Sequence, residues 1–234
     1  MHVAADAAVI EMPRRHEERG PAGDLISSRL LTAGVKRFDA REHLFCEGDA
    51  AQHVFRIEQG YACIYKMLPD GRRQVVDFAY PGDLVGLGSS GEHETSAQAL
   101  GVCRVKCIPA PAIRQMCLQD PDFGLKVYEV LAQELRSARE LLLSCCQRSA
   151  AERLATFLVQ MSRRNGAKGM DTATVFLPMT RSDIGDYLGL TIETVSRTFS
   201  KFKAMGLISL DHCTTVKLKD IEALERLAEG GGEQ

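Results

Sequence analysis

The stretch LPMTRSDIGDYLGLTIETVSRTFSKFKAMGLI, residues 177–208, constrains the fold of this chain more than any other segment. Thr180 is a suitable N-cap for a short helix, and Gly189 is placed to end that helix. Thr191 can cap a second helix, which we expect to run to about residue 205, before Gly206. A short helix, a three-residue turn containing glycine and a second helix together predict a helix-turn-helix.

The spacing inside this segment agrees with that interpretation. Gly185 lies where the two helices would cross, and a larger side chain there would collide with the second helix. The second helix also has a predicted buried stripe, at spacings of four, three and three, that consists of Val195, Phe199, Phe202 and Met205.

The remaining faces of the second helix are polar. In a recognition helix, the N-terminal residues reach the floor of the DNA major groove. Arg197 offers two donors that match N7 and O6 of guanine, and Glu193 can accept from the amino group of cytosine. Ser196 can contact a base edge or a thymine methyl group. Phosphate contacts, which position a protein without specifying sequence, are expected from Arg181, Thr191, Lys201 and Lys203.

A simpler interpretation exists for Glu193 and Arg197. Four residues apart on a helix, they would form a surface ion pair worth only about 0.3 to 0.5 kcal/mol. The complete helix-turn-helix around them favours DNA contact instead. Charge distribution points the same way, because residues 148–220 carry 11 Lys and Arg against 7 Asp and Glu, whereas residues 1–147 carry 17 against 20.

Two regions predict antiparallel strands. GLISL and TTVKLKD flank Asp211 and His212 and predict a small hairpin, the wing of a winged helix. Between residues 35 and 110, short apolar alternations are separated by Gly48-Asp49, Gly60, Asp70-Gly71 and Gly82-Asp83. Regular short strands with turn glycines predict an antiparallel β-sandwich or roll.

A long helix is expected to join these regions. Asp120-Pro121-Asp122 supplies a helix start, and the following residues to 147 contain no proline and only one glycine. A heptad seam that suits a homodimer is formed by Tyr128, Leu131, Leu135, Ala138 and Leu142, flanked by Gly124 and Cys145. The alternative is a helix laid on its own β-roll through Val127, Val130 and Leu141, and one helix can do both.

These observations predict an α+β chain with five segments. We expect a loosely ordered arm at 1–24, a β-roll at 25–120, a dimerisation helix at 121–147, a winged helix-turn-helix domain at 148–221 with the helix-turn-helix at 181–200, and a C-terminal tail at 222–234. A capping box formed by Ser149 and Glu152 opens the first helix of the DNA-binding domain, which we expect to end near Asn165.

Composition excludes several other classes. The sequence has no apolar run long enough to span a membrane and no signal peptide, so we expect a cytoplasmic protein. The eight cysteines form no Cys-x-x-Cys pair, and we expect neither a metal nor a cofactor. Cys213, near the wing, and Cys145, on the seam, are possible redox thiols. No nucleophile and base pairing or phosphate-binding loop indicates an enzyme.

From residue 25 to about 225, the order of elements resembles the CRP/FNR family of bacterial transcription regulators. LPMTRSDIGDYLGLTIETVSR, with LPDGRRQVV and PGDL, is most similar to the FixK branch. The resemblance implies a homodimeric, cyclic-nucleotide-binding-like fold, an activator of low-oxygen genes, and RNA polymerase as a partner. It also implies that Glu193, Ser196 and Arg197 read one half of a TTGA-N6-TCAA palindrome.

The sequence departs from the cyclic-AMP-binding members of that family. Thr95-Ser96 stands where those members have Arg-Ser, so a cyclic phosphate would lack its main charged partner and no cyclic nucleotide is expected. No cysteine precedes Cys46, which argues against the iron–sulfur cluster of FNR. The alternative function is a ligand-gated or haem-gated sensor, with His43, Cys46 and His53 as conceivable haem ligands.

Overall fold

The N-terminal half of the described chain is a β-roll. The computed structural model describes residues 34–88, 91–211 and 214–231. One antiparallel sheet has the strand order β1-β8-β3-β6, and the other has the order β2-β7-β4-β5. The strands are β1 (Val35–Phe38), β2 (His43–Phe45), β3 (His53–Gln59), β4 (Ala62–Met67), β5 (Arg73–Ala79), β6 (Leu84–Val85), β7 (Ser96–Ala99) and β8 (Cys103–Pro109). The predicted antiparallel roll is confirmed.

The turn glycines identified in the sequence have the positive φ angles expected of tight turns. Gly48, Gly60, Gly71 and Gly82 all have φ between 82° and 96°, a region that side chains disfavour. Gly71 closes the hairpin between β4 and β5, where the Gly71 N–H donates to the Leu68 carbonyl at 2.9 Å. This hairpin places β5 at the edge of its sheet.

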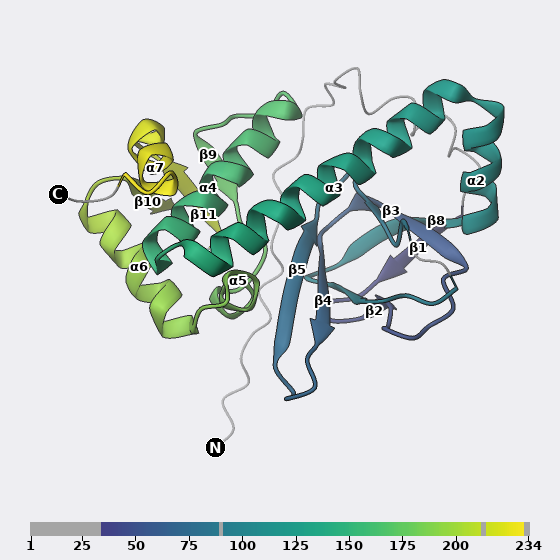
Figure 1. Ribbon diagram of the computed structural model, residues 1–234, viewed down its shortest axis with the longest axis horizontal. Helices are drawn as coiled ribbons and strands as arrows, with labels where there is room; N and C mark the ends of the chain where they lie inside the picture. The colour runs from purple at the N-terminus through teal and green to yellow at the C-terminus, as the bar shows by residue number, and fades with distance from the viewer. Residues whose placement is uncertain (1–33, 89–90, 212–213, 232–234) are drawn as a thin grey trace.

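Two helices follow the roll. Helix α3 (Pro121–Gln147) begins as predicted, with the Asp120 side chain accepting a hydrogen bond from the Phe123 N–H. Figure 1 shows α3 extending from the roll to the C-terminal elements. The shorter α2 (Ala110–Gln119) was not predicted, because residues up to 120 were assigned to the β-roll; Pro111 stands in its first turn. Proline in the first turn is in fact compatible with a helix start, since the N–H groups there have no helical partner.

The C-terminal half is a winged helix-turn-helix. Its elements are α4 (Ala150–Ala167), β9 (Thr174–Phe176), α5 (Arg181–Leu188), α6 (Ile192–Ala204), β10 (Ile208–Asp211), β11 (Thr215–Leu218) and α7 (Ile221–Ala228). The capping box of Ser149 and Glu152 opens α4, which ends two residues later than expected. The predicted wing hairpin of β10 and β11 is confirmed, and β9 adds a third antiparallel strand.

The C-terminal tail predicted at 222–234 has to be corrected, because residues 221–228 form helix α7. Asp220 caps this helix by accepting from the Ala223 N–H at 2.8 Å. Leu224 is fully buried within the C-terminal core. The apolar spacing of Ile221, Leu224, Leu227 and Ala228 was the signal for an amphipathic helix.

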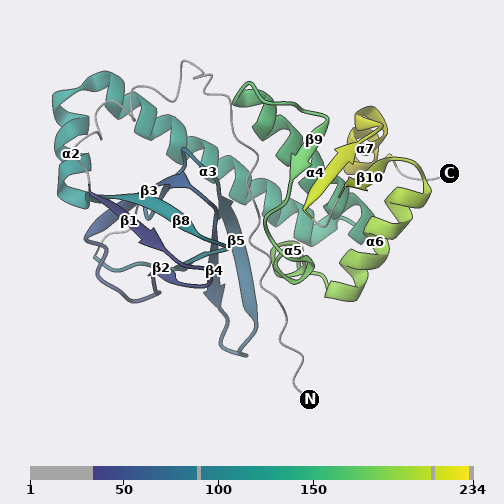
Figure 2. The same ribbon diagram turned by 180° about the vertical axis from the view of Figure 1, so that it is seen from behind.

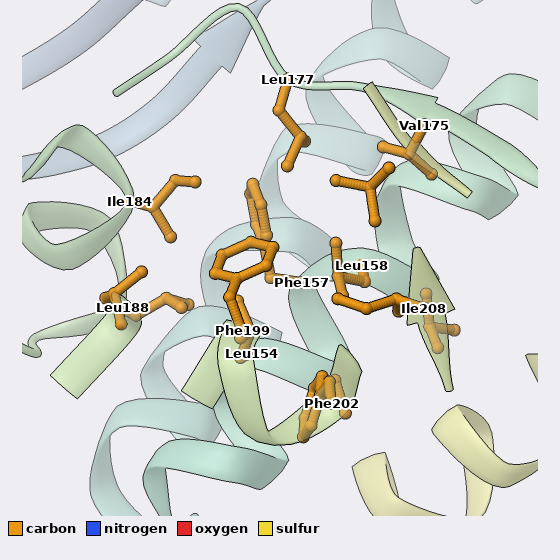
Figure 3. Packing of buried hydrophobic residues seen from close by; sticks show 14 of the residues in the cluster. Leu154, Phe157, Leu158, Val175, Leu177, Ile184, Leu188, Phe199, Phe202 and Ile208 are labelled. Carbon is orange, nitrogen blue, oxygen red and sulfur yellow. The ribbon is translucent and has the colours of Figure 1, made fainter. Parts of the chain in front are cut away.

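One apolar core joins the roll to the C-terminal domain. Cys63, Val75 and Phe78 of the roll belong to the same buried cluster as the helix-turn-helix core. The Phe78 ring lies 6.4 Å from the ring of Phe157 and 5.4 Å from that of Tyr187. Figure 2 shows the two halves side by side along α3, and Figure 3 shows the packing within the C-terminal part of the cluster. The β-roll therefore packs directly against the helix-turn-helix.

Candidate nucleic-acid interface

Helix α5 is the first helix of the predicted helix-turn-helix, and its own sequence caps both ends. The Asp183 N–H donates to Thr180 Oγ1 at 3.1 Å, while the Thr180 N–H donates to Asp183 Oδ2 at 2.9 Å. This reciprocal capping box satisfies two N–H groups at the helix start. Gly189, with φ of 65°, ends the helix in the left-handed conformation.

The crossing of α5 and α6 depends on Gly185. A Cβ added at Gly185 would lie 2.7 Å from the backbone oxygen of Leu190, closer than real Cβ contacts come. The Leu190 N–H donates to the Gly185 carbonyl at 2.9 Å, which fixes the turn. Val195 is fully buried between the helices. The close crossing inferred from the sequence is present.

Helix α6 buries most of the predicted apolar stripe. Val195, Phe199 and Phe202 are buried in the C-terminal cluster, and Figure 3 shows both phenylalanines within it. Met205 was wrongly placed in that stripe, because it is 49% exposed. It follows the last helical residue, so the helical period no longer applies to it. Thr198 is buried instead, and its hydroxyl donates to the Thr194 carbonyl.

The three predicted base-reading residues share the outward side of α6. Glu193, Ser196 and Arg197 are all exposed. The pKa of Glu193 is lowered by hydrogen bonds from its own N–H and from Thr191, so the side chain is an anionic acceptor near neutral pH. Within the described residues, Glu193 and Arg197 form no ion pair, and Arg197 instead donates to Thr194 Oγ1 at 3.4 Å. Both side chains are therefore available to a ligand in front of α6.

The four residues predicted to contact phosphate lie around this surface, and they differ in the contacts that they already make within the protein. Lys201 and Lys203 are exposed in the last turns of α6. Thr191 is exposed too, but its hydroxyl already accepts from the Thr194 N–H as the cap of α6. The Arg181 guanidinium lies 3.5 Å from the centre of the Phe199 ring, so it stacks on the recognition helix as well as lying at the start of α5.

Arg153 ties this unit to the long helix, a role that sequence reasoning missed. Its Nε donates to the Arg148 carbonyl at 2.8 Å, and its Nη1 donates to the Leu188 carbonyl at 2.9 Å. Its Nη2 donates to the Cys145 carbonyl at 2.8 Å. One guanidinium thus satisfies carbonyls at the ends of α3 and α5, where a cation is favourable. Its sequence position, in the first turn of an amphipathic helix, gives no sign of this.

The predicted seam of α3 lies on a solvent-facing side of the single chain. Tyr128 is 69% exposed, Leu135 is 51% exposed and Leu142 is 63% exposed; Leu131 and Ala138 are exposed as well. The opposite face packs inward through Phe123 and Val127. The helix therefore covers its own roll with one face and leaves a second apolar face unused.

Of the two proposed redox thiols, one can be described. Cys145 is partly buried, and its Sγ lies 3.7 Å from the Leu188 carbonyl oxygen at the end of α5. Burial raises the pKa of this thiol, although the Arg153 guanidinium opposes the shift. A raised pKa lowers the thiolate fraction and hence the reactivity. Cys213 lies outside the described residues.

The interior of the roll is filled by side chains. Phe38, Phe45, Phe55 and Ile57 form its buried cluster, and the His93 ring stacks on Phe45 at 3.7 Å. Ser96, beside the position where the phosphate-binding arginine would stand, accepts from the Glu47 N–H at 3.0 Å. A hollow of about 520 Å³ lies elsewhere, at the start of α2, lined by Ala51, Gln52, His53, Gly91, Pro109, Ala110, Pro111 and Arg114.

The fold and this surface define a winged helix-turn-helix DNA-binding protein with a β-roll preceding it. Residues 152–227 match the Crp-like helix-turn-helix domain, and residues 35–120 match the cyclic nucleotide-binding domain. The chain belongs to the CRP/FNR family of transcription regulators and is not an enzyme. No helix within the described residues combines the length and apolar character needed to cross a membrane.

Two relatives and one solved structure illustrate this membership. The chain is 40% identical over 191 residues to the nitrogen fixation regulation protein FixK of Bradyrhizobium diazoefficiens, covering 82% of this chain and 80% of the relative. It is 41% identical over 192 residues to the transcriptional activatory protein AadR of Rhodopseudomonas palustris, covering 82% and 79%. The structure of FixK2 from Bradyrhizobium japonicum aligns with a TM-score of 0.77 at 34% identity, covering 84% of this chain and 97% of that one.

Proposed function

We propose that this chain is a FixK-type transcription activator of low-oxygen genes that binds a TTGA-N6-TCAA palindrome as a cytoplasmic homodimer. The observation that carries the proposal is the exposed set Glu193, Ser196 and Arg197 on the first two turns of α6. The similarity to FixK and to an activatory protein supports the class of target gene and the direction of regulation. RNA polymerase is the expected partner of such an activator.

Recognition of each half-site follows from the chemistry of these side chains. Arg197 would donate two hydrogen bonds to N7 and O6 of the TTGA guanine, and Glu193 would accept from the amino group of the paired cytosine. Ser196 would contact a thymine. Lys201 and Lys203 would bind phosphates, which makes the affinity dependent on salt without adding sequence preference.

A two-fold symmetric target requires two copies of α6, and the free face of α3 supports their pairing. Leu131, Leu135 and Leu142 leave apolar area in water that a second α3 would bury. A two-fold axis through that seam would present the two recognition helices to successive major grooves. The dimer therefore matches the palindrome in symmetry.

We also propose that the roll binds no cyclic nucleotide. Thr95 replaces the arginine that would neutralise a cyclic phosphate, and Ser96 is already engaged by the Glu47 N–H. Aromatic and aliphatic side chains occupy the roll interior. If a thiol regulates the protein, Cys213 fits better than Cys145, whose pKa is raised by burial.

A gel-shift series with purified full-length protein tests the proposal. At fixed salt, the protein should bind a TTGA-N6-TCAA duplex at least about a thousandfold more tightly than a scrambled duplex. Arg197→Ala should cost about 1 to 3 kcal/mol on the palindrome and relax the preference for guanine. Equal affinity of the unmodified protein for both duplexes would refute the proposal.

Lys201→Ala is the matched comparison, because it removes one positive charge from the same helix. We expect it to weaken binding to both duplexes by the same factor and to reduce the slope of log affinity against log salt by about one. A loss for Lys201→Ala confined to the palindrome would mean that base reading and phosphate contact are assigned to the wrong residues.

A further inference from the structure

Helix α5 is too short to be stable without contacts from other segments. It has eight residues, whereas isolated helices below about 12 to 15 residues are marginal in water. Its last carbonyls depend on residues from other segments. The Gln74 side chain of β5 donates to the Asp186 carbonyl at 2.7 Å and to the Tyr187 carbonyl at 3.4 Å. A strand of the β-roll therefore completes a helix of the DNA-binding domain.

Arg73, the neighbour of Gln74, forms ion pairs with the same helix. Its Nε donates to Asp186 Oδ2 at 2.9 Å, and its Nη2 pairs with both Asp183 and Asp186. Asp183 is the residue that caps α5 through Thr180, and its side chain is only 9% exposed. Because both carboxylates lie close together on α5, removing the Arg73 charge leaves two like charges without a shared partner.

A second set of contacts also joins the two domains. Near the end of α4, Arg164 pairs with Asp83 of the β5–β6 turn and stacks over the Tyr80 ring at 4.4 Å. Lys168 donates to the Pro81 carbonyl at 2.9 Å and pairs with the same Asp83 at 3.2 Å. Figures 1 and 2 show β5 alongside α5.

We propose that Arg73 and Gln74 are positioning residues for DNA recognition: β5 holds α5, and α5 holds α6 in the orientation that a half-site requires. This inference rests on the proposed function. The coupling between α5 and α6 is tight, because they cross at Gly185 with no room for a Cβ. A small rotation of α5 therefore also rotates α6, and with it Glu193 and Arg197, because the tightly packed turn cannot adjust.

Charge reversal in the full-length dimer tests the inference. Arg73→Glu should lower affinity for the palindrome at least about tenfold, because the competent orientation is then populated only in part. Affinity for a scrambled duplex should stay unchanged, since the phosphate-binding lysines are intact. Adding Asp186→Arg to Arg73→Glu should restore part of the lost palindrome affinity, because it rebuilds the pair at position 186 in reverse while Asp183 still faces a like charge. Arg72→Glu, at an exposed position paired with Asp70, is the control of equal charge change.

Gln74→Ala is a milder variant that leaves the ion pairs in place, and it should lower the palindrome affinity by a smaller factor. Circular dichroism and thermal unfolding of every variant separate positioning from loss of fold. The inference is overturned if Arg73→Glu and Gln74→Ala bind the palindrome like the unmodified protein, if both duplexes lose affinity equally, or if the reversed pair gives no rescue. Failure of the unmodified protein to prefer the palindrome would instead refute the proposed function itself.

Discussion

Gly185→Ala is a perturbation for which helix propensity and packing predict opposite signs. Within a helix interior, replacing glycine by alanine stabilises by about 0.8 to 1.0 kcal/mol. Here the new Cβ would lie 2.7 Å from the Leu190 oxygen, 3.6 Å from the Leu190 carbonyl carbon and 3.7 Å from the Ile192 nitrogen. All three atoms belong to the backbone, so the turn and α6 have to move away as a unit.

The magnitude follows from these contacts. Overpacking of this kind costs about 1 to 3 kcal/mol. The displacement also lengthens the 2.9 Å hydrogen bond from the Leu190 N–H to the Gly185 carbonyl, which is worth about 0.5 to 1.5 kcal/mol. After the gain in propensity is subtracted, we expect a net loss of roughly 0.5 to 3.5 kcal/mol in the free energy of unfolding.

Urea titration followed by far-ultraviolet circular dichroism measures this change, and gel shifts on the palindrome measure its effect on recognition. Gly166→Ala is the matched control, since Gly166 is also helical but its Cβ would meet only the methyl group of Thr172, at 3.0 Å. We expect the control to retain stability and DNA affinity. If Gly185→Ala unfolds at higher urea than the unmodified protein, the steric account of the helix crossing is wrong.

Three further predictions follow from the site and the seam. Thr180→Ala removes the capping box of α5 and should cost about 1 kcal/mol in the free energy of unfolding, measured by urea titration. Burial by itself raises the pKa of Asp183, but hydrogen bonds from Thr180 and Arg73 outweigh burial and hold the pKa below its ordinary value. The ionised Asp183 carboxylate therefore stabilises the fold above the ordinary carboxyl pKa of about 3.9, and this stability is lost as the pH falls through the lower pKa of the folded state. Asp183→Asn should accordingly flatten the dependence of the free energy of unfolding on pH in that acid range. Leu135→Glu should convert the dimer to a monomer in analytical ultracentrifugation, whereas Gln133→Glu, at an exposed position off the seam, should leave the dimer intact.

Local signals were sufficient for most of the helix-turn-helix. Caps, a left-handed glycine and a period of 3.6 act over a few residues, so Thr180, Gly189 and the stripe from Val195 to Phe202 were predicted directly. The prediction that Met205 is buried was wrong, because a periodic pattern does not show where the helix ends. Helix α7 was missed, since residues 222–234 were predicted as a tail, although Ile221, Leu224 and Leu227 have the apolar spacing of an amphipathic helix.

The sequence by itself determined the order of the domains, the recognition helix and the identity of its outward side chains, because these depend on contacts between near neighbours in the chain. Only the tertiary structure decided how the β-roll meets the DNA-binding domain. Arg73 and Asp183 are 110 positions apart in the sequence, and no local pattern around either residue predicts that they pair. Such a pair forms because the β-roll and the helix-turn-helix pack together and bury Phe78 against Tyr187, which brings opposite charges within hydrogen-bonding distance.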